Sequence, residues 1–230
     1  MNADMKYALV TGSSRGIGQA IADTIERNGY VVFRNGRSEV NHPHYIMADL
    51  STLDGVNTLA DTVLALAPML DCVVLNAGMT CRMNLNDMEY SCWQQVMDTN
   101  VNMPFFLIQR LFERISSNGS VLFTSSVLSV KPHASSIPYG VSKSAINMLA
   151  QCLVKEFAPR NIRVNVICPG FIDTEWQKEK PLWLRKKIES KISLSRFGSP
   201  EEVAGACMSV IANSYINGAI IQVDGGYDLE

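Results

Sequence analysis

The 230-residue sequence has no long uninterrupted apolar run and no large excess of charge of either sign. Its 20 basic and 22 acidic side chains give a net charge of −2, which offers no global field for a nucleic acid or an anionic membrane. The N-terminal stretch MNADMKYALVTG leads directly into a glycine-rich turn and does not resemble a signal peptide. We therefore expect a cytoplasmic protein that binds neither nucleic acid nor membrane.

Closely spaced cysteine pairs and Cys/His clusters are also missing. The six cysteines are far apart in the sequence and form no C-x-x-C pair: Cys72, Cys81, Cys92, Cys152, Cys168 and Cys207. No zinc-like spacing is present, so we expect no metal site. Buried free thiols are the default expectation for these side chains.

Short β-branched and apolar segments alternate with longer helical patterns along the chain. The expected strands are Tyr7 to Thr11, Val31 to Phe33, Tyr45 to Ala48, Cys72 to Leu75, Val121 to Thr124, Arg163 to Ile167 and Ile220 to Val223. The expected helices are Ile17 to Asn28, Gly55 to Leu66, Met88 to Ile115, Tyr139 to Phe157 and Glu201 to Ala212. Continuous apolar strands alternating with helices predict a doubly wound, seven-stranded parallel sheet of the Rossmann-like α/β class in a single domain, residues 1–230.

The connection between the second and third strands is unusually short. A parallel crossover normally needs a dozen or more residues and usually contains a helix, but little chain separates Arg37 from Tyr45, and Pro43 interrupts it. We therefore predict a shortened crossover without a helix.

A glycine-rich segment joins the first strand to the first helix. Gly12, Gly16 and Gly18 have the spacing G-x-x-x-G-x-G. Glycines let the backbone approach a pyrophosphate closely, and the N-terminus of the following helix favours negative charge. An ordinary strand-helix turn is the alternative, but the position at the first β-α junction favours dinucleotide binding.

Tyr139 and Lys143 share one face of an expected helix because they are four residues apart. A neighbouring ammonium would stabilise a phenolate and lower the tyrosine pKa, although a packing tyrosine beside a solvated lysine is the common case for this spacing. Ser126 follows a strand at the sheet edge where ligands bind; it could be a turn residue, and Ser125 competes with it. Asn100 could cap a turn of its helix.

Together these motifs resemble the short-chain dehydrogenase/reductase family. The family landmarks run in order along the whole chain: Thr11-Gly12-x-x-x-Gly16-x-Gly18, Asp49-Leu50, Asn76-Ala77-Gly78, Asn100, Ser126, Tyr139-x-x-x-Lys143 and Pro169-Gly170 to Thr174. The later segments Arg196-Phe197-Gly198, Ser199-Pro200-Glu201-Glu202 and Asp224-Gly225-Gly226 are similar to the 3-oxoacyl carrier-protein reductase branch.

The resemblance implies that NADPH gives a hydride to a carbonyl carbon while Tyr139 protonates the oxygen. In this scheme Ser126, selected by its family spacing to Tyr139, orients that oxygen. Lys143 also holds the nicotinamide ribose, and Asn100 binds a water linked to Lys143. The implied cofactor contacts are Gly12, Ser14, Arg15, Gly16, Ile17, Gly18, Arg37, Asp49, Leu50, Asn76, Ala77, Gly78, Tyr139, Lys143, Ile172 and Thr174, of which Ile172 and Thr174 would hold the carboxamide.

The residues at the end of the second strand indicate whether the protein prefers NAD or NADP. Gly36 stands where NAD-preferring relatives carry aspartate, and Arg37 follows it. Arg15 projects from the glycine loop, and two guanidinium groups suit one 2'-phosphate. Glu39 has nearly the spacing of an NAD-type acidic residue, but it falls beyond the strand end, so we expect NADP(H).

The resemblance implies a small carbonyl substrate, and the sequence leaves three functions open. They are reduction of a 3-oxoacyl thioester, reduction or oxidation of another ketone or alcohol such as a sugar, steroid or small metabolite, and non-catalytic NADPH binding by a regulator. Arg160 matches an acyl-carrier-protein contact, yet Ser116-Ser117-Asn118-Gly119 stands where those enzymes are more basic, which speaks against carrier docking.

Residues 175–192 resemble the family's substrate lid. Trp176, Trp183 and Leu184 lie among basic residues there, and an amphipathic surface helix pair is the alternative. The helices Met88 to Ile115 and Tyr139 to Phe157 correspond to those that pair in family oligomers, which implies a homotetramer or homodimer.

Overall fold

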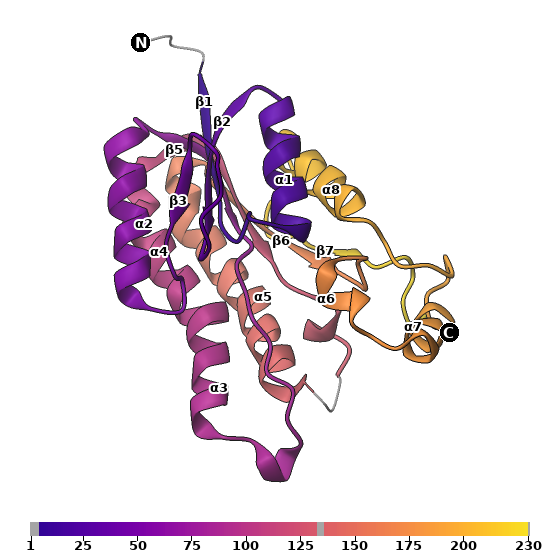
Figure 1. Ribbon diagram of the computed structural model, residues 1–230. Helices are drawn as coiled ribbons and strands as arrows, with labels where there is room; N and C mark the ends of the chain where they lie inside the picture. Colours follow the sequence, from indigo (N-terminus) through magenta and orange to yellow (C-terminus); the bar gives the residue numbers. More distant parts are fainter. Residues whose placement is uncertain (1–4, 133–135, 230) are drawn as a thin grey trace.

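The seven strands form one parallel sheet in the order β3-β2-β1-β4-β5-β6-β7 (Figure 1). This computed structural model describes residues 5–132 and 136–229, so part of the predicted 1–230 domain and of its N-terminal stretch lies outside the described residues. The strands are β1 (Lys6–Val10), β2 (Tyr30–Gly36), β3 (Tyr45–Met47), β4 (Leu70–Leu75), β5 (Ile115–Thr124), β6 (Arg163–Pro169) and β7 (Ile220–Val223). The doubly wound parallel sheet predicted from the sequence is confirmed.

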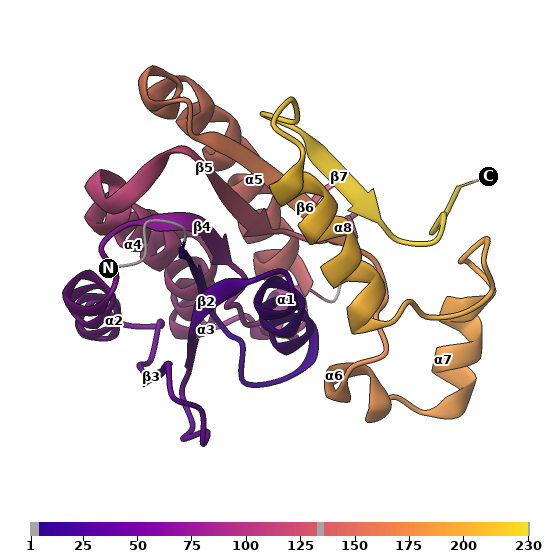
Figure 2. The ribbon, with the colours of Figure 1, turned by 90° about the horizontal axis from the view of Figure 1, so that it is seen from above.

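Helices cover both faces of the sheet, which is why the central strands are apolar along their whole length. Every residue of β6 is buried. Figure 2 shows α1 and α8 on one face and α2, α4 and α5 on the other, each layer packed on its own apolar core. The helices are α1 (Gly16–Arg27), α2 (Leu53–Leu66), α3 (Tyr90–Met97), α4 (Met103–Leu111), α5 (Ile137–Phe157), α6 (Glu175–Lys178), α7 (Leu182–Glu189) and α8 (Pro200–Ala212).

The shortened crossover is also confirmed. β2 ends at Gly36 and β3 begins at Tyr45, with no helix between them. The returning chain stays close to β2, since the Arg34 backbone N–H donates to the His44 carbonyl at 2.9 Å. At the other end of the chain, Ser199 and Glu202 form a capping box at the N-terminus of α8.

The predicted helix Met88 to Ile115 is wrong in its boundaries and in its regularity. It begins at Tyr90, contains a π turn over Asp98–Asn102, and ends in a short 3-10 turn before β5 starts at Ile115. The Arg160 guanidinium donates to the Phe112 carbonyl at 2.6 Å and to the Ile115 carbonyl, which satisfies backbone acceptors where the helix stops. The periodic apolar pattern alone did not reveal either feature.

α6 and α7 lie outside the two helical layers, beside the carboxyl end of β6 (Figure 2). Nothing in the described chain forms a helix long and apolar enough to cross a membrane.

Candidate active site

Most of the residues singled out by the sequence lie at the carboxyl edge of the sheet. The glycine loop follows β1, Asn76 to Gly78 follow β4, Ser126 follows β5, and residues 170–174 follow β6. In a doubly wound sheet this edge is where ligands bind, beside the point at which the strand order reverses. That reversal lies between β1 and β4 in this chain.

The glycine loop packs too tightly for side chains. Gly12 has a positive φ of 62°, and a Cβ atom there would lie 2.8 Å from Ala77 Cα. At Gly18 a Cβ atom would lie 2.1 Å from the Gly12 carbonyl oxygen. The loop residues Ser14, Arg15, Gly16 and Ile17 lead into α1, whose first turn carries no acidic residue and no side-chain cap, so its N–H groups are free to bind an anion.

Asn76 and Thr11 hold the loop against the strand that follows it in the sheet. Asn76 Nδ2 donates to the carbonyls of Thr11 and Gly12, both at 3.1 Å. In return Thr11 Oγ1 accepts the backbone N–H groups of Asn76 at 2.9 Å and Ala77 at 3.0 Å. These bonds occupy Asn76 Nδ2, so the side chain braces the glycine loop.

Lys143 is buried behind Tyr139 on α5. Its Nζ donates to the Thr124 carbonyl at 2.7 Å and lies 5.7 Å from the centre of the Tyr139 ring. Ser126, buried just after β5, accepts the Leu128 N–H at 3.2 Å. A hydrogen bond with the Ser126 side chain acts to lower the pKa of Tyr139. Its neighbour Ser125 points elsewhere and donates to the Lys143 carbonyl at 2.9 Å. The structure therefore places Ser126, not Ser125, beside the phenol.

Asn100 lies in the π turn between α3 and α4 and is buried. Its side chain accepts the Met79 N–H at 2.8 Å and donates to the Met79 carbonyl and to Ser142 Oγ, both at 2.9 Å. A Cβ atom at Gly78 would lie 3.2 Å from Asn100 Oδ1 and 3.4 Å from Lys143 Nζ. Gly78 thus marks the point where Asn100 and Lys143 come together, and π turns often occur at functional sites.

The expected lowering of the Tyr139 pKa is wrong for the protein alone. Burial raises the pKa of Tyr139, while Ser126 and the positive charge of Arg82 act in the opposite direction. Lys143 does not offset the effect of burial on the pKa of Tyr139, because its amino group faces the Thr124 carbonyl and the Tyr139 ring. Burial lowers the pKa of Lys143 itself to about 8. The phenol therefore keeps its proton at neutral pH, as a proton donor must.

The residues expected to read the 2'-phosphate come from two segments, Arg15 from the glycine loop and Arg37 from the chain just after β2. Arg37 directly follows β2 and is exposed. Arg15 pairs with Glu175 at 3.0 Å across the opening between the glycine loop and α6. Arg34, by contrast, is buried and bound to Asp23 and Glu26, both at 2.6 Å. Of these three arginines, Arg15 and Arg37 are the ones that present their charge to solvent.

The expected adenine contacts lie just beyond β3. Leu50 is buried in the core, and the Asp49 carboxylate accepts the Ser51 N–H at 3.0 Å. On the nicotinamide side, Thr174 Cγ2 would meet a Cβ atom at Gly16 at 3.4 Å, so the segment after β6 touches the phosphate loop. The Ile172 side chain is buried in the core, which leaves only its backbone to contact a cofactor.

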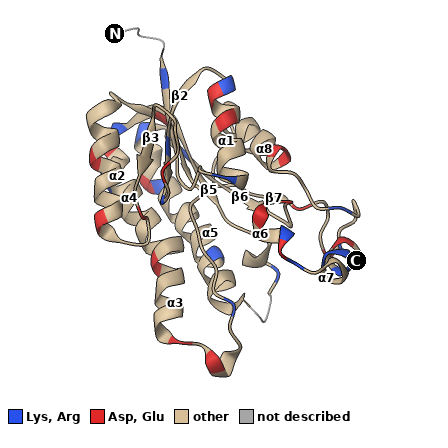
Figure 3. Cartoon of the chain, in the orientation of Figure 1, with Lys and Arg blue, Asp and Glu red and all other residues tan. Residues whose placement is uncertain are grey.

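One residue of the segment expected to be the lid contacts the tyrosine. The Trp176 ring on α6 meets the Tyr139 ring edge to face, with centroids 6.4 Å apart. A pocket of about 350 Å³ lies between Arg15 and this segment, lined also by Glu175 and Trp176. Figure 3 shows charged residues concentrated along α6, α7 and the turn between them.

Several residues that shape the site were missed by sequence reasoning. Asn35 on β2 braces the loop and the third strand: its Oδ1 accepts the Gly12 N–H at 3.5 Å, and its Nδ2 donates to the Ile46 and Ala48 carbonyls. The Tyr45 hydroxyl lies against Gly36 at the end of β2, and the positive charge of Arg82 acts to lower the pKa of Tyr139. Position at the carboxyl end of a strand was the available signal for Asn35, whereas Arg82 lies in a loop that gives no such signal.

A second correction concerns the cysteines. Cys81 and Cys92 form a disulfide between the loop after β4 and α3, so the expectation of free thiols is wrong for this pair. Their Cα atoms are 6.3 Å apart because α3 returns beside the loop, a contact that sequence spacing does not reveal. Among the others, Cys152 is exposed, while the free and buried thiols are those of Cys72, Cys168 and Cys207.

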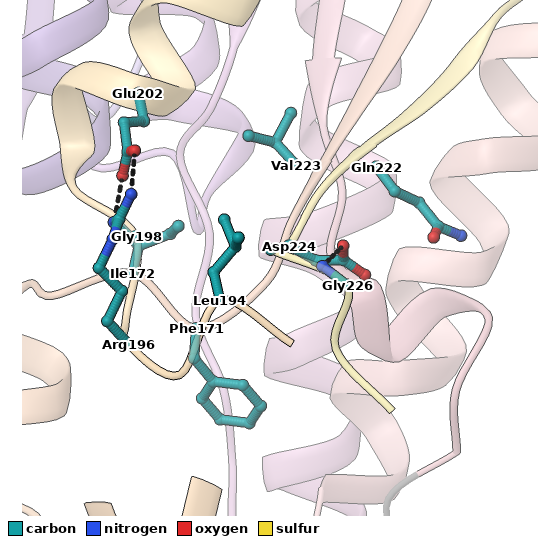
Figure 4. A pocket seen from close by; sticks show the side chains of 11 residues that line it. Phe171, Ile172, Leu194, Arg196, Gly198, Glu202, Gln222, Val223, Asp224 and Gly226 are labelled. Atoms are coloured by element: carbon teal, nitrogen blue, oxygen red, sulfur yellow. Dashed lines mark hydrogen bonds and ion pairs between the residues drawn. The ribbon is translucent and has the colours of Figure 1, made fainter. Parts of the chain in front are cut away.

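A separate pocket of about 330 Å³ lies at the carboxyl end of β7, away from Tyr139 (Figure 4). Phe171, Leu194 and Asp224 line it, and the Arg196–Glu202 ion pair closes one side at 2.6 Å. Glu202 is committed to that pair, since the hydrogen bond from Arg196 lowers the pKa of its carboxyl to about 2. We assign no chemistry to this pocket.

Comparison with known proteins agrees with this geometry. A family model described as enoyl-(acyl carrier protein) reductase matches residues 12–228. The chain is 35% identical over 250 residues to glucose 1-dehydrogenase 2 of Bacillus subtilis, covering 97% of this chain and 95% of the relative. It is 32% identical over 244 residues to the 3-oxoacyl-(acyl-carrier-protein) reductase of Aquifex aeolicus, covering 96% of each.

The chain is also similar to solved structures over nearly its whole length. A Pseudomonas aeruginosa structure described as an RhlG/NADP active-site complex matches with a TM-score of 0.90 and 31% identity, covering 97% of this chain and 96% of the other. A short-chain dehydrogenase of Burkholderia cenocepacia in complex with NADP matches with a TM-score of 0.89 and 26% identity, covering 96% and 97%. The chain therefore belongs to the short-chain dehydrogenase/reductase family of oxidoreductases, within which it resembles the 3-oxoacyl carrier-protein reductases.

Proposed function

We propose that the protein is an NADPH-dependent reductase of a small ketone, with Tyr139 as the proton donor. The observation that carries the proposal is the meeting of Asn100 and Lys143 at Gly78, just after β4, with Lys143 Nζ 5.7 Å from the centre of the Tyr139 ring. Bound NADPH would supply the hydride, and the protein would supply binding, orientation and the proton.

Each side chain of the cluster has a distinct task. Tyr139 would donate its hydroxyl proton to the carbonyl oxygen, since the phenol still carries that proton at neutral pH. Ser126 would hold the same oxygen from the end of β5. Lys143 would bind the nicotinamide ribose hydroxyls. Asn100 would be a positioning residue, because its side chain is already hydrogen-bonded to Met79 and Ser142. If water relays a proton here, it would bind to the backbone of the π turn and not to the Asn100 side chain.

The cofactor assignment rests on charge at the end of β2. Gly36 offers no carboxylate to a ribose hydroxyl, and the exposed Arg15 and Arg37 can both donate to a 2'-phosphate. Two similar solved structures are described as complexes with NADP. Glu39 is also exposed beyond the strand end and remains the residue that would favour NAD.

The substrate class is less narrowly defined. The relatives include oxoacyl carrier-protein reductases and a glucose dehydrogenase, so a 3-oxoacyl thioester and another ketone or alcohol are both candidates. Arg160, the residue that matches a carrier-protein contact, is bound to the Phe112 and Ile115 carbonyls and lies 5.0 Å over the Phe112 ring. That engagement argues against docking of an acyl carrier protein through Arg160.

A homodimer or homotetramer built on α4 and α5 is part of the proposal. Phe106 on α4 and Val141 and Met148 on α5 are exposed apolar side chains, and burying them against a second copy would be favourable.

The test is a panel of ketones assayed by NADPH absorbance with three forms of the enzyme. Tyr139→Phe should abolish turnover and leave NADPH binding nearly unchanged, because the ring still packs but the proton donor is gone. Lys143→Ala should weaken both turnover and NADPH binding. Turnover by Tyr139→Phe at a rate comparable with the unmodified enzyme would refute the assignment of the donor.

A further inference from the structure

The short turn that follows Ser126 is tied to α5 by a chain of hydrogen bonds. Asn147 Nδ2 on α5 donates to Ser129 Oγ at 2.9 Å, and Ser129 Oγ donates to the Ser126 carbonyl at 2.6 Å. The Ser129 backbone N–H donates to the same carbonyl at 2.9 Å. The proposed reaction uses neither side chain directly, yet the chain ends on the backbone of the residue that would hold the substrate oxygen.

The direction of this chain follows from the chemistry of its members. A side-chain amide nitrogen can only donate, and a hydroxyl has a single proton to donate. Because Ser129 Oγ accepts from Asn147, its own proton is directed to the Ser126 carbonyl. Hydrogen bonds linked in series polarise one another, which strengthens the hold on Ser126.

Asn147 is an unfavourable residue for its position unless its amide is used. It lies in the interior of α5, where asparagine has a low helix propensity, and it is only 7% exposed. A buried amide without partners costs free energy. The Cys168 thiol of β6 lies 3.9 Å from Asn147 Oδ1, but a thiol is a weak donor. The bond to Ser129 is therefore the stronger of these two contacts.

The same helix carries the proposed proton donor. Tyr139, Lys143 and Asn147 follow one another on α5 at intervals of four residues, so they lie on the same side of the helix. Asn147 thus links the turn after β5 to the helix that positions Tyr139. Ser126 and Tyr139 are held in one frame although they come from different elements.

The Ser126 hydroxyl is oriented by the turn that this chain holds. Its oxygen accepts the Leu128 N–H at 3.2 Å, as the N-cap of the turn. A hydroxyl oxygen that accepts in this way can still donate its proton to a substrate oxygen. The place of that proton depends on the backbone of Ser126, which Ser129 fixes through the carbonyl.

We propose that Asn147 and Ser129 are positioning residues for the reaction, which set the place of the Ser126 hydroxyl relative to Tyr139 through the Ser126 carbonyl. Neither side chain would touch the substrate. The inference rests on the proposed reductase function and extends its site to groups behind Ser126. A misplacement of about 1 Å in an orienting group can lower a rate by up to about 100-fold.

The kinetic test uses the ketone that the unmodified enzyme reduces best. Ser129→Ala and Asn147→Leu should each lower kcat about tenfold or more and leave the ketone KM and the NADPH dissociation constant nearly unchanged. Ser129→Thr keeps a hydroxyl and should retain most of the turnover. Ser209→Ala is the matched control, because Ser209 Oγ on α8 also donates to a backbone carbonyl, that of Gly205 at 2.9 Å. It should leave kcat unchanged.

A double-mutant cycle separates positioning from a general loss of stability. If Ser129 acts through the Ser126 hydroxyl, Ser129→Ala should not lower kcat further once Ser126→Ala has removed that hydroxyl. The same should hold for Asn147→Leu. An equal loss with and without the Ser126 hydroxyl, or no loss in the otherwise unmodified enzyme, would overturn the inference and leave the reductase function in place.

A readout without turnover covers the cases in which no ketone is reduced or Ser126→Ala is inactive. Ser126 acts on the Tyr139 hydroxyl by hydrogen bonding, so Ser126→Ala should shift the carbon-13 resonance of the ring carbon that bears this hydroxyl. The signal is assigned with Tyr139→Phe. Ser129→Ala and Asn147→Leu should shift it in the same direction, and Ser209→Ala should not. No shift in Ser126→Ala, or none in both of the other two variants, refutes the inference, whereas absent turnover alone refutes the reductase function.

Discussion

The Tyr45 hydroxyl occupies the space next to the Gly36 Cα: a Cβ atom built on Gly36 would lie 2.2 Å from Tyr45 Oη and 3.1 Å from Ser14 Oγ. Tyr45 Oη is held in place by donating to the Ser38 carbonyl at 2.7 Å. An acidic residue that binds the ribose of NAD belongs at this strand end. A side chain at Gly36 would therefore have to displace the Tyr45 hydroxyl, which would add to the preference for NADP(H) that we propose for Arg15 and Arg37.

This contact predicts how cofactor preference can be changed. Gly36→Asp alone should destabilise the protein and weaken NADPH use without creating efficient NADH use, because the new Cβ collides with Tyr45. Gly36→Asp combined with Tyr45→Ala should gain NADH activity. Arg37→Asp, which leaves the Gly36–Tyr45 contact intact, is the matched control and should shift preference toward NADH by roughly tenfold or more. Measured kcat/KM values for NADPH and NADH in the three variants test these expectations. Efficient use of NADH by Gly36→Asp alone would contradict them.

The local motifs were predictable from the sequence, whereas the contacts between them were not. Gly12, Tyr139 and Lys143 were found because a glycine turn and an i, i+4 pair are short-range patterns. The missing helix before Tyr45 was found because too little chain was left to form one. In each case, the information lies within a few neighbouring residues.

Other features depend on packing between segments distant in the sequence. The Lys143 amino group turns to the Thr124 carbonyl because β5 ends beside α5, so its expected effect on the tyrosine pKa fails. The approach of Tyr45 to Gly36 requires β3 to pair with β2 in its observed register. The Cys81–Cys92 bond requires α3 to return beside the loop. No spacing rule in the sequence encodes these relationships.

Buried Lys143 should reduce the stability of the folded protein. Burial lowers the pKa of Lys143 from 10.5 to about 8, so its protonated form is disfavoured in the folded state. The penalty is fully present below pH 8. It is relieved as pH rises from about 8 to 10.5, because in that window the unfolded state binds more protons than the folded state and stability increases with pH.

Lys143→Met should therefore be inactive yet more stable at pH 7, by about 1 kcal/mol. One pKa unit corresponds to about 1.4 kcal/mol, and the lost hydrogen bond to Thr124 offsets part of the total. Urea unfolding from pH 7 to 10 should show that the advantage of the variant shrinks as pH rises. Lys155→Met, an exposed position on the same helix, is the control. A variant that is less stable at pH 7, or an advantage independent of pH, would count against the account of Lys143.

The Cys81–Cys92 disulfide should stabilise the loop that carries Arg82. It closes a loop with a sequence separation of 11, for which loop-closure entropy predicts a contribution of about 2–3 kcal/mol. Cys81→Ser should lower the free energy of unfolding by about that amount. Cys152→Ser removes an exposed free thiol and should leave the free energy of unfolding unchanged. Thiol labelling of the unfolded, unreduced chain should detect four free cysteines; six would disprove the bond.

The short crossover between β2 and β3 bears on how the cofactor is held. Residues 37–44 contain no helix, so less protein is present to pack against the adenine where a crossover helix would otherwise lie. A larger share of NADPH affinity should then come from the phosphates. The Arg15 and Glu175 side chains are 71% and 67% exposed, so charge interactions at this position are open to screening by salt.

Raising the ionic strength from about 0.01 to 0.15 M shortens the Debye length from about 30 to 8 Å. The NADPH dissociation constant should therefore rise more than that of NADH, because only NADPH carries the 2'-phosphate. Calorimetric titration of both cofactors at the two salt concentrations measures the difference, and Arg15→Gln combined with Arg37→Gln should reduce it. Pairing with Glu175 already engages Arg15, so Arg37→Gln alone should account for most of the reduction. Equal increases for NADPH and NADH in the unmodified protein would mean that neither arginine reads the 2'-phosphate.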